Sequence, residues 1–208
     1  MKYFSKSLLA VAIIAPIYVA PVSAQPVLEE IVVSARKRAE SLEDSPISAT
    51  AFTEDAIRQA GIQSAQDFVN LTPNVTLVQT QNAGNSFLNI RGVSQARNSE
   101  MSAAVLIDGV LMSNPAQLSQ QLFDIEQVEV LRGPQGALYG RNAIGGAITI
   151  TTKAPSDEME GVLEVGAGSG GSKNVRGSIS GPVGESNNVH YRLSGSFTDT
   201  DGHLKNTY

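Results

Sequence analysis

The chain has 208 residues, a formal net charge of −5, and only 17% charged and 5% aromatic residues. This balance provides no basic excess to support a nucleic-acid-binding role. With 19 glycines and no tryptophan, the composition favours β structure with many turns over a helical bundle. The sequence contains no cysteine, which is compatible with export to an oxidising compartment.

Residues 1–24 predict a cleaved signal peptide. Two lysines form a positive n-region, residues 8–20 form an apolar h-region, and Val22-Ser23-Ala24 supplies small residues at the cleavage positions. The alternative is a transmembrane anchor, but the apolar run is shorter than the roughly 20 residues needed to span a bilayer. We therefore expect an exported chain that begins at Gln25.

The stretch EEIVVSARKR at residues 29–38 contains a β-branched run that favours an extended strand. It lies near the expected mature N-terminus, has no evident strand partner nearby, and precedes a polar linker that ends at Pro46. Such a peptide can pair with the exposed sheet edge of another protein. The alternative is an ordinary edge strand of the domain that follows.

Residues 47–71 predict a strand and two short helices. Residues 47–52 alternate as in a strand, Thr53 is a suitable N-cap, and Gly61 supplies a helix stop. Ser64 and Asp67 have the spacing of a capping box for a second helix. The expected apolar face of that helix consists of Ala65, Phe68, Val69 and Leu71.

Short strands dominate the sequence from there to residue 155. The Asp108-Gly109 pair between two apolar runs predicts a hairpin turn. Residues 113–121 read as a polar loop, and residues 124–127 read as a single helical turn. Further strands are predicted at 75–79, 87–91, 128–131 and 147–152. The mixture indicates a small α/β or α+β domain.

The pattern changes after Pro155 to a strict period of two. In residues 189–198 one face carries Val189, Tyr191, Leu193 and Phe197, and the other carries His190, Arg192, Ser194, Ser196 and Thr198. Residues 161–169 and 174–184 repeat the alternation more weakly. Alternation of this kind is typical of a membrane β-barrel strand, although a half-buried soluble sheet alternates too. Three alternating segments cannot close a barrel, because even small barrels need about eight strands. We therefore expect the chain to be a fragment or a truncated gene product of a longer protein.

Three stretches resemble the plug domain of TonB-dependent outer-membrane receptors: NIRGV at 89–93, VLIDGVLM at 105–112, and FDIEQVEVLRGPQGALYGRNAIGGAITITTK at 123–153. The last is rich in glycine but lacks the spacing and the lysine of a phosphate-binding loop. The resemblance implies an α+β plug domain, a small mixed sheet with short helices. The first antiparallel strands of a transmembrane β-barrel of about 22 strands would follow. The implied segments are the signal peptide 1–24, the TonB box and linker 25–44, the plug 45–155 and the barrel start 156–208.

Within this resemblance, EIVVSA resembles the TonB box, which adds as a strand to the periplasmic energy-transducing protein TonB. The residues expected to bind TonB are Glu30, Ile31, Val32, Val33, Ser34 and Ala35. Arg91 and Arg132 match two plug arginines that, in the family, latch the plug by pairing with glutamates of the barrel wall. Those barrel glutamates lie outside this chain.

Outward-facing plug loops bind ligand in this family. The matching segments are rich in Asn, Gln and Ser, which suits hydrogen bonding to a polar ligand. The expected ligand-binding residues are Gln81, Asn82, Asn85, Arg97, Asn98, Asn114 and Gln117. No His or carboxylate cluster is evident, so we expect no metal site and no cofactor. If an iron chelate is carried, the chelator holds the metal.

The resemblance implies active transport of a scarce ligand across the bacterial outer membrane, most often an iron siderophore or similar chelate. Cobalamin and oligosaccharides are other ligand classes of the family. The implied partners are TonB, the ligand, outer-membrane lipid and the chain's own barrel. No catalytic grouping is evident, because His190 and His203 both fall in the barrel portion. The alternatives are a free-standing plug-only periplasmic binding or interaction protein and a non-functional receptor fragment.

Overall fold

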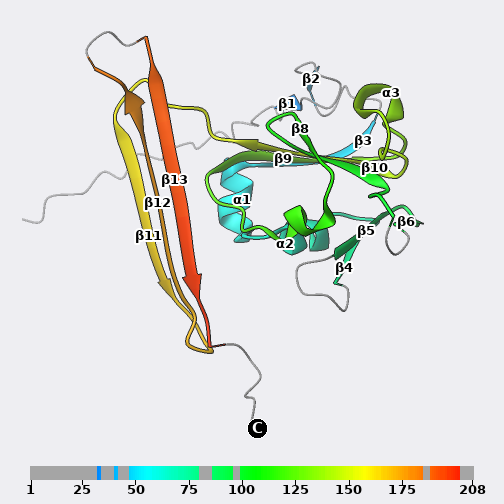
Figure 1. Ribbon diagram of the computed structural model, residues 1–208, viewed down its shortest axis with the longest axis horizontal. Helices are drawn as coiled ribbons and strands as arrows, with labels where there is room; N and C mark the ends of the chain where they lie inside the picture. The colour runs from blue at the N-terminus through cyan, green and yellow to red at the C-terminus, as the bar shows by residue number, and fades with distance from the viewer. Residues whose placement is uncertain are drawn as a thin grey trace, which may run out of the picture.

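The computed structural model describes residues 32–33, 40–41, 47–79, 86–95, 99–184 and 188–201. Figure 1 shows a mixed α/β body beside a separate three-stranded sheet of long, narrow strands. The body contains the central sheet, three helices and one 3-10 turn. The long strands lie along one side of it and contact it through their polar face, as described below.

The body is built on a five-stranded mixed sheet in the order β3-β9-β10-β7-β8. Its central strand β10 pairs antiparallel with β9 and parallel with β7, and β3 pairs antiparallel with β9. The strands are β3 (Ser48–Thr53), β7 (Ala103–Ile107), β8 (Val110–Met112), β9 (Ile125–Arg132) and β10 (Gly146–Thr152).

The predicted local signals form the first helices and the first hairpin. α1 (Glu54–Ala60) begins where Thr53 Oγ1 accepts a hydrogen bond from the Ala56 N–H, and it ends at Gly61 in the left-handed region. α2 (Ala65–Asn70) begins with the expected Ser64–Asp67 capping box. Asp108 and Gly109 have φ values of 49° and 78°, so they form the predicted tight turn between β7 and β8.

Three sequence-based expectations are wrong in this region. Residues 124–127 do not form a helical turn, because Asp124 has a φ of 61° and β9 begins at Ile125. The expected polar loop contains a 3-10 turn, η1 (Pro115–Ser119). Leu71 does not share the buried face of α2 but is exposed, because the helix has ended before it. A further helix, α3 (Gly136–Tyr139), lies inside the glycine-rich motif.

The main apolar core lies between the helices and one face of the sheet. Its largest fully buried members include Phe68 of α2, Leu88 and Ile148. A small second sheet adds to this core and consists of β4 (Val75–Gln79), β5 (Ser86–Ile90) and β6 (Val93–Ser94). The opposite face of the five-stranded sheet has a separate, smaller cluster.

A glycine is required at one position of the glycine-rich motif. Gly146 has a φ of 158°, and a Cβ added there would lie 2.2 Å from the Leu131 carbonyl oxygen. β9 and β10 therefore approach closely only because this position has no side chain. Glycine is therefore required at residue 146 for the packing of two strands, and phosphate binding is not needed to explain it.

The long strands β11 (Glu160–Ala167), β12 (Lys173–Pro182) and β13 (His190–Asp199) form an antiparallel meander with unbroken register. The predicted alternation of apolar and polar residues is confirmed. The strand register places the predicted apolar residues of β13 beside apolar residues of the neighbouring strand, on the same face of the sheet. The outward, exposed apolar face includes Leu163, Val165, Val175, Ile179, Leu193 and Phe197. The other face is mainly polar and is turned toward the body.

Candidate functional site

The short strands β1 and β2 lie on the face of the central sheet opposite to α1 and α2 (Figure 1). β1 (Val32–Val33) pairs antiparallel with β2 (Glu40–Ser41). Val33 is fully buried in the smaller cluster with Ala104, Leu106, Leu131, Ala143 and Ala147. The expectation of a run without a strand partner is wrong for Val32 and Val33, because the tail pairs with its own linker. The other TonB-box residues, Glu30, Ile31, Ser34 and Ala35, lie outside the described residues.

A carboxylate and a phenol lie on the same face of the central sheet as Val33. Glu129 is 2% exposed and stands between Ala51 of β3 and Thr149 of β10. Burial raises the pKa of the Tyr139 phenol, and the charge of Glu129 acts in the same direction, whereas a hydrogen bond with Thr149 opposes the shift.

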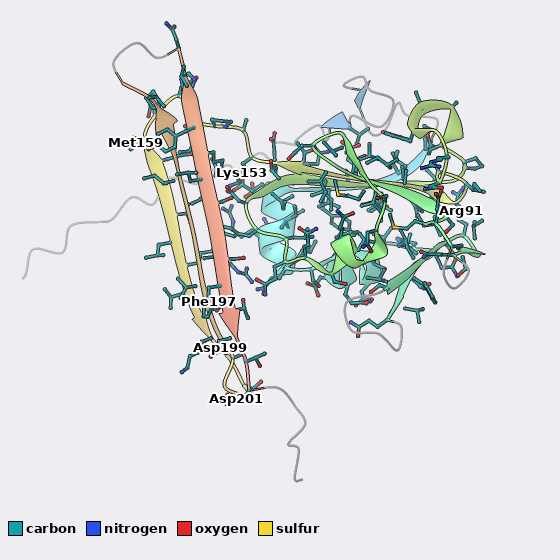
Figure 2. All side chains as sticks on the ribbon, in the orientation of Figure 1. Arg91, Lys153, Met159, Phe197, Asp199 and Asp201 are labelled. Atoms are coloured by element: carbon teal, nitrogen blue, oxygen red, sulfur yellow. The ribbon has the colours of Figure 1, made fainter. Side chains whose placement is uncertain are left out.

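The two predicted latch arginines lie at one corner of the body, far from the long strands. Arg91 follows β5 with a φ of 52°, and a Cβ on Gly133 would lie 3.3 Å from its Nη1. The Arg132 guanidinium donates to the Pro73 and Ala49 carbonyl oxygens at 3.1 and 3.4 Å. Within the described part of the chain, neither arginine forms an ion pair. Figure 2 shows Arg91 at this corner.

The described members of the predicted ligand loops lie together at η1. The Asn114 N–H donates to Gln117 Oε1 at 3.2 Å, and the Gln117 N–H donates to the Asn114 carbonyl at 3.0 Å. The two residues therefore cap the 3-10 turn and stiffen it. The other predicted residues, Gln81, Asn82, Asn85, Arg97 and Asn98, lie outside the described residues.

A buried arginine of β13 joins the body to the long strands. Arg192 donates from Nε and Nη2 to the two carboxylate oxygens of Asp124, both at 2.6 Å. Its Nη1 donates to Glu160 Oε1 at 3.1 Å and to the Ala154 carbonyl at 3.3 Å. The side chains of Arg192 and Asp124 are 10% and 7% exposed. This bidentate, charge-assisted arrangement fixes the start of β9, the linker and β11 relative to β13.

Only one half of this contact is predictable from the sequence. The alternation places Arg192 on the inward polar face, but Asp124 lies 68 residues away, in a segment where the sequence predicts a helical turn. Two further contacts follow the same face: Arg176 Nη2 donates to Gln63 Oε1 at 2.7 Å, and Gln121 Nε2 donates to Thr198 Oγ1 at 2.9 Å. The polar face of the meander is thus bonded directly to the body.

The described residues contain no group of three or more His, Cys, Asp or Glu side chains that could hold a metal ion. None of the helices within the described ranges is long and apolar enough to cross a membrane. An α+β body bonded to the polar face of strands whose other face is apolar has the arrangement of a domain seated inside a membrane barrel. The geometry thus defines a plug with its adjoining wall.

Comparison with known proteins agrees with this class. The TonB-dependent Receptor Plug Domain family matches residues 41–147. The chain is 31% identical to the pesticin receptor of Yersinia pestis over 154 residues, which are 74% of this chain and 23% of that protein. It is 31% identical to the vitamin B12 transporter BtuB of Vibrio vulnificus over 207 residues, covering 95% of this chain and 33% of that protein. The chain belongs to the TonB-dependent receptor family.

Solved structures give the same fold. The ferric yersiniabactin uptake receptor FyuA from Yersinia pestis matches with a TM-score of 0.62 and 31% identity, over 67% of this chain and 22% of that one. The ferripyoverdine receptor of Pseudomonas aeruginosa matches with a TM-score of 0.70 over 81% of this chain and 22% of that one, at 24% identity. The α+β plug followed by antiparallel strands is therefore confirmed. The chain spans about a quarter of the length of the pesticin receptor.

Proposed function

We propose that this chain forms the plug and first wall strands of a receptor that carries a scarce polar ligand across the bacterial outer membrane with energy supplied through TonB. An iron siderophore or a similar chelate is the proposed ligand class. The relatives support this choice, since they include a ferrioxamine B receptor of Salmonella typhimurium and a ferric yersiniabactin uptake receptor. The proposed segments are residues 25–44 as tail, 45–155 as plug and 156–208 as wall.

The position of Val33 is the observation that carries the coupling proposal. Its side chain is fully buried on the plug, in a tail that pairs only with its own two-residue strand among the described residues. Burying a valine side chain contributes about 1.5–3 kcal/mol, so a modest free energy holds the tail in place. A partner that pairs with residues 30–35 as an added strand can exceed that value.

The proposed sequence of events follows from this arrangement. Ligand binds on the outer side, where the loops after β4 and around η1 supply amide and hydroxyl groups. TonB then captures residues 30–35 from the periplasm. Force on the tail acts on the sheet face formed by β7, β9 and β10, because Val33 packs against these strands. We propose that this force rearranges the plug and opens a path.

The latch role of Arg91 and Arg132 remains part of the proposal. A charge at a confined interface is stable when it is paired, and the two arginines lie together at a corner of the plug away from β11–β13. Glutamates of the remaining barrel wall are the proposed partners. Removing one arginine would loosen the plug in the barrel without preventing it from folding.

Deletion of residues 30–35 in the whole receptor tests the coupling proposal. We expect accumulation of the ligand to stop, while binding of ligand to the cell surface remains unchanged. A matched control replaces Arg36, Lys37 and Arg38 with serine, which alters the adjoining linker but leaves the β-branched run intact. Continued accumulation after the deletion would rule out a coupling role for the tail.

A further inference from the structure

A crevice lined by both polar and apolar side chains separates the plug from the inner face of β11 and β12. One cavity of about 370 Å³ lies between α1 with the loop that follows it and the meander. A second cavity of about 500 Å³ continues along the same wall. The residues that line both cavities are Glu54, Lys153, Val162 and Ser178. The two cavities therefore form one crevice, and the Lys153–Glu54 ion pair, at 2.5 Å, stands where they meet. Figure 2 shows Lys153 between the plug and the strands.

Arg176 of β12 is the residue that points to a ligand. It lines the first cavity and is only 7% exposed. Its Nη2 donates to Gln63, but its buried Nε has no hydrogen-bond partner in the part of the chain that the structure describes. A buried donor without an acceptor costs free energy, and an acceptor in the crevice recovers it once the Arg176 side chain turns toward the cavity that it lines. A guanidinium group is matched best by a planar, negatively charged oxygen group.

The other cations along the crevice already have carboxylate partners. Lys153 pairs with Glu54, Arg58 with Asp55, and Arg192 with both Asp124 and Glu160. Glu164 is the cross-strand neighbour of Arg176 and lines the same cavity, but these two form no ion pair within the described ranges. Arg176 is therefore the cation of this crevice that is placed to meet an incoming anion.

We propose that the crevice is a transit site for solute and that Arg176 binds a carboxylate group of that solute as it passes along the wall. The proposal rests on the transport function proposed above, and it assigns the path to one side of the plug. A cavity of about 370 Å³ lies within the usual range for small-molecule sites, roughly 300–1,000 Å³. The Lys153–Glu54 pair narrows the passage, so solute must separate or bypass it.

The test measures the local charge and accessibility at Ser178, which lines both cavities. Residues i and i+2 of a strand share a face about 7 Å apart, so a cysteine at 178 lies near the Arg176 side chain. The chain has no native cysteine, and the unsubstituted receptor corrects for thiols elsewhere. Ser178→Cys in outer membranes is labelled with an anionic and a cationic methanethiosulfonate reagent, and the ratio of the two rates is recorded.

We expect Ser178→Cys to react with both reagents, with the anionic reagent favoured. Adding Arg176→Gln should lower the anionic-to-cationic rate ratio about tenfold, as expected for loss of one nearby unit charge. Arg176→Lys should retain most of the ratio. Arg58→Gln is the matched control, because Arg58 lines the same cavity but is exposed and paired with Asp55; it should change the ratio less than twofold.

A second experiment uses citrate as the carboxylate probe. It is carried out on Ser178→Cys alone, without a substitution at Arg176. We expect it to slow labelling of Ser178→Cys, whereas glycerol at the same concentration does not. Absence of labelling by either reagent, a ratio unchanged by Arg176→Gln, or no protection by citrate would each overturn the transit site. Labelling requires neither TonB nor uptake, so deletion of residues 30–35 tests the proposed function independently of this result.

Discussion

Removal of the Arg192 guanidinium should loosen the contact between the plug and the adjoining wall strand. Arg192→Gln leaves Asp124 buried, at 7% exposure, without its bidentate partner. Breaking a buried ion pair by removing one member costs about 3–5 kcal/mol. Both side chains are at most 10% exposed while the pair is intact, and water that enters beside the shorter glutamine brings the loss toward the lower end of this range.

Removal of the opposite charge should cost less. In Asp124→Asn the arginine keeps Glu160 at 3.1 Å and the Ala154 carbonyl at 3.3 Å, and the asparagine oxygen still accepts one hydrogen bond. We therefore expect a loss of about 1.5–3 kcal/mol, the range of a single hydrogen bond to a charged group. The double variant should cost little more than Arg192→Gln alone, because both changes remove the same interaction.

Hydrogen exchange in the purified receptor measures this difference. The Lys153 amide donates to the Asp124 carbonyl at 3.0 Å, so its exchange reports opening at this corner. At about 1.4 kcal/mol for each factor of ten, Arg192→Gln should accelerate exchange by about two to three orders of magnitude, and Asp124→Asn by about one to two orders of magnitude. A change below threefold in Arg192→Gln, or an equal effect of the two variants, would refute the reasoning.

Three further variants test the packing of the plug and its tail. Gly146→Ala should cost more than about 3 kcal/mol and reduce the amount of folded receptor, since its Cβ would lie 2.2 Å from the Leu131 carbonyl oxygen. Gly136→Ala is the control and should be neutral, because its Cβ meets no atom within 4 Å. Equal amounts of folded receptor in the two variants would contradict the packing role of Gly146. Val33→Ala should weaken tail docking by about 1–2 kcal/mol and raise amide exchange at Val32 and Val33 about tenfold; unchanged exchange would show that the burial of Val33 does not hold the tail. Phe68→Ala, which removes a fully buried ring, should destabilise the plug by about 3–5 kcal/mol in denaturant unfolding, whereas Ile144→Ala at a 67% exposed side chain should have almost no effect.

Features that depend on neighbouring residues could be predicted from the sequence. The Thr53 N-cap, the Gly61 stop, the Ser64–Asp67 capping box and the Asp108-Gly109 turn all formed as expected. Each rests on contacts within a few residues, where side-chain chemistry selects one backbone conformation. The alternation of β13 could be predicted equally well, because successive side chains of a strand point to opposite faces of the sheet and these two faces have different environments.

Features that depend on distant partners could not be predicted. Residues 124–127 resemble a helical turn locally, yet Asp124 has a left-handed backbone and its carboxylate binds Arg192 of β13, 68 residues further on. Arg176 looked like one polar residue of a weakly alternating strand, and its position beside Gln63 depends on a separation of 113 residues. Docking of Val33 likewise depends on small residues contributed by β7 and β10, which the sequence of the tail does not reveal.

The central claim is that the tail leaves the plug and is captured as an added strand by TonB, and backbone pairing is the part that can be tested most directly. The measurement is the affinity of the periplasmic domain of TonB for the receptor. The test variants are Val32→Pro and Val33→Pro, and the controls are Val32→Thr and Val33→Thr. Adjacent N–H groups of a strand point to opposite edges, and proline removes the donor. The account predicts that at least one proline variant weakens binding tenfold or more, while both threonine variants bind nearly as well as the unchanged receptor. Full affinity in both proline variants would contradict it.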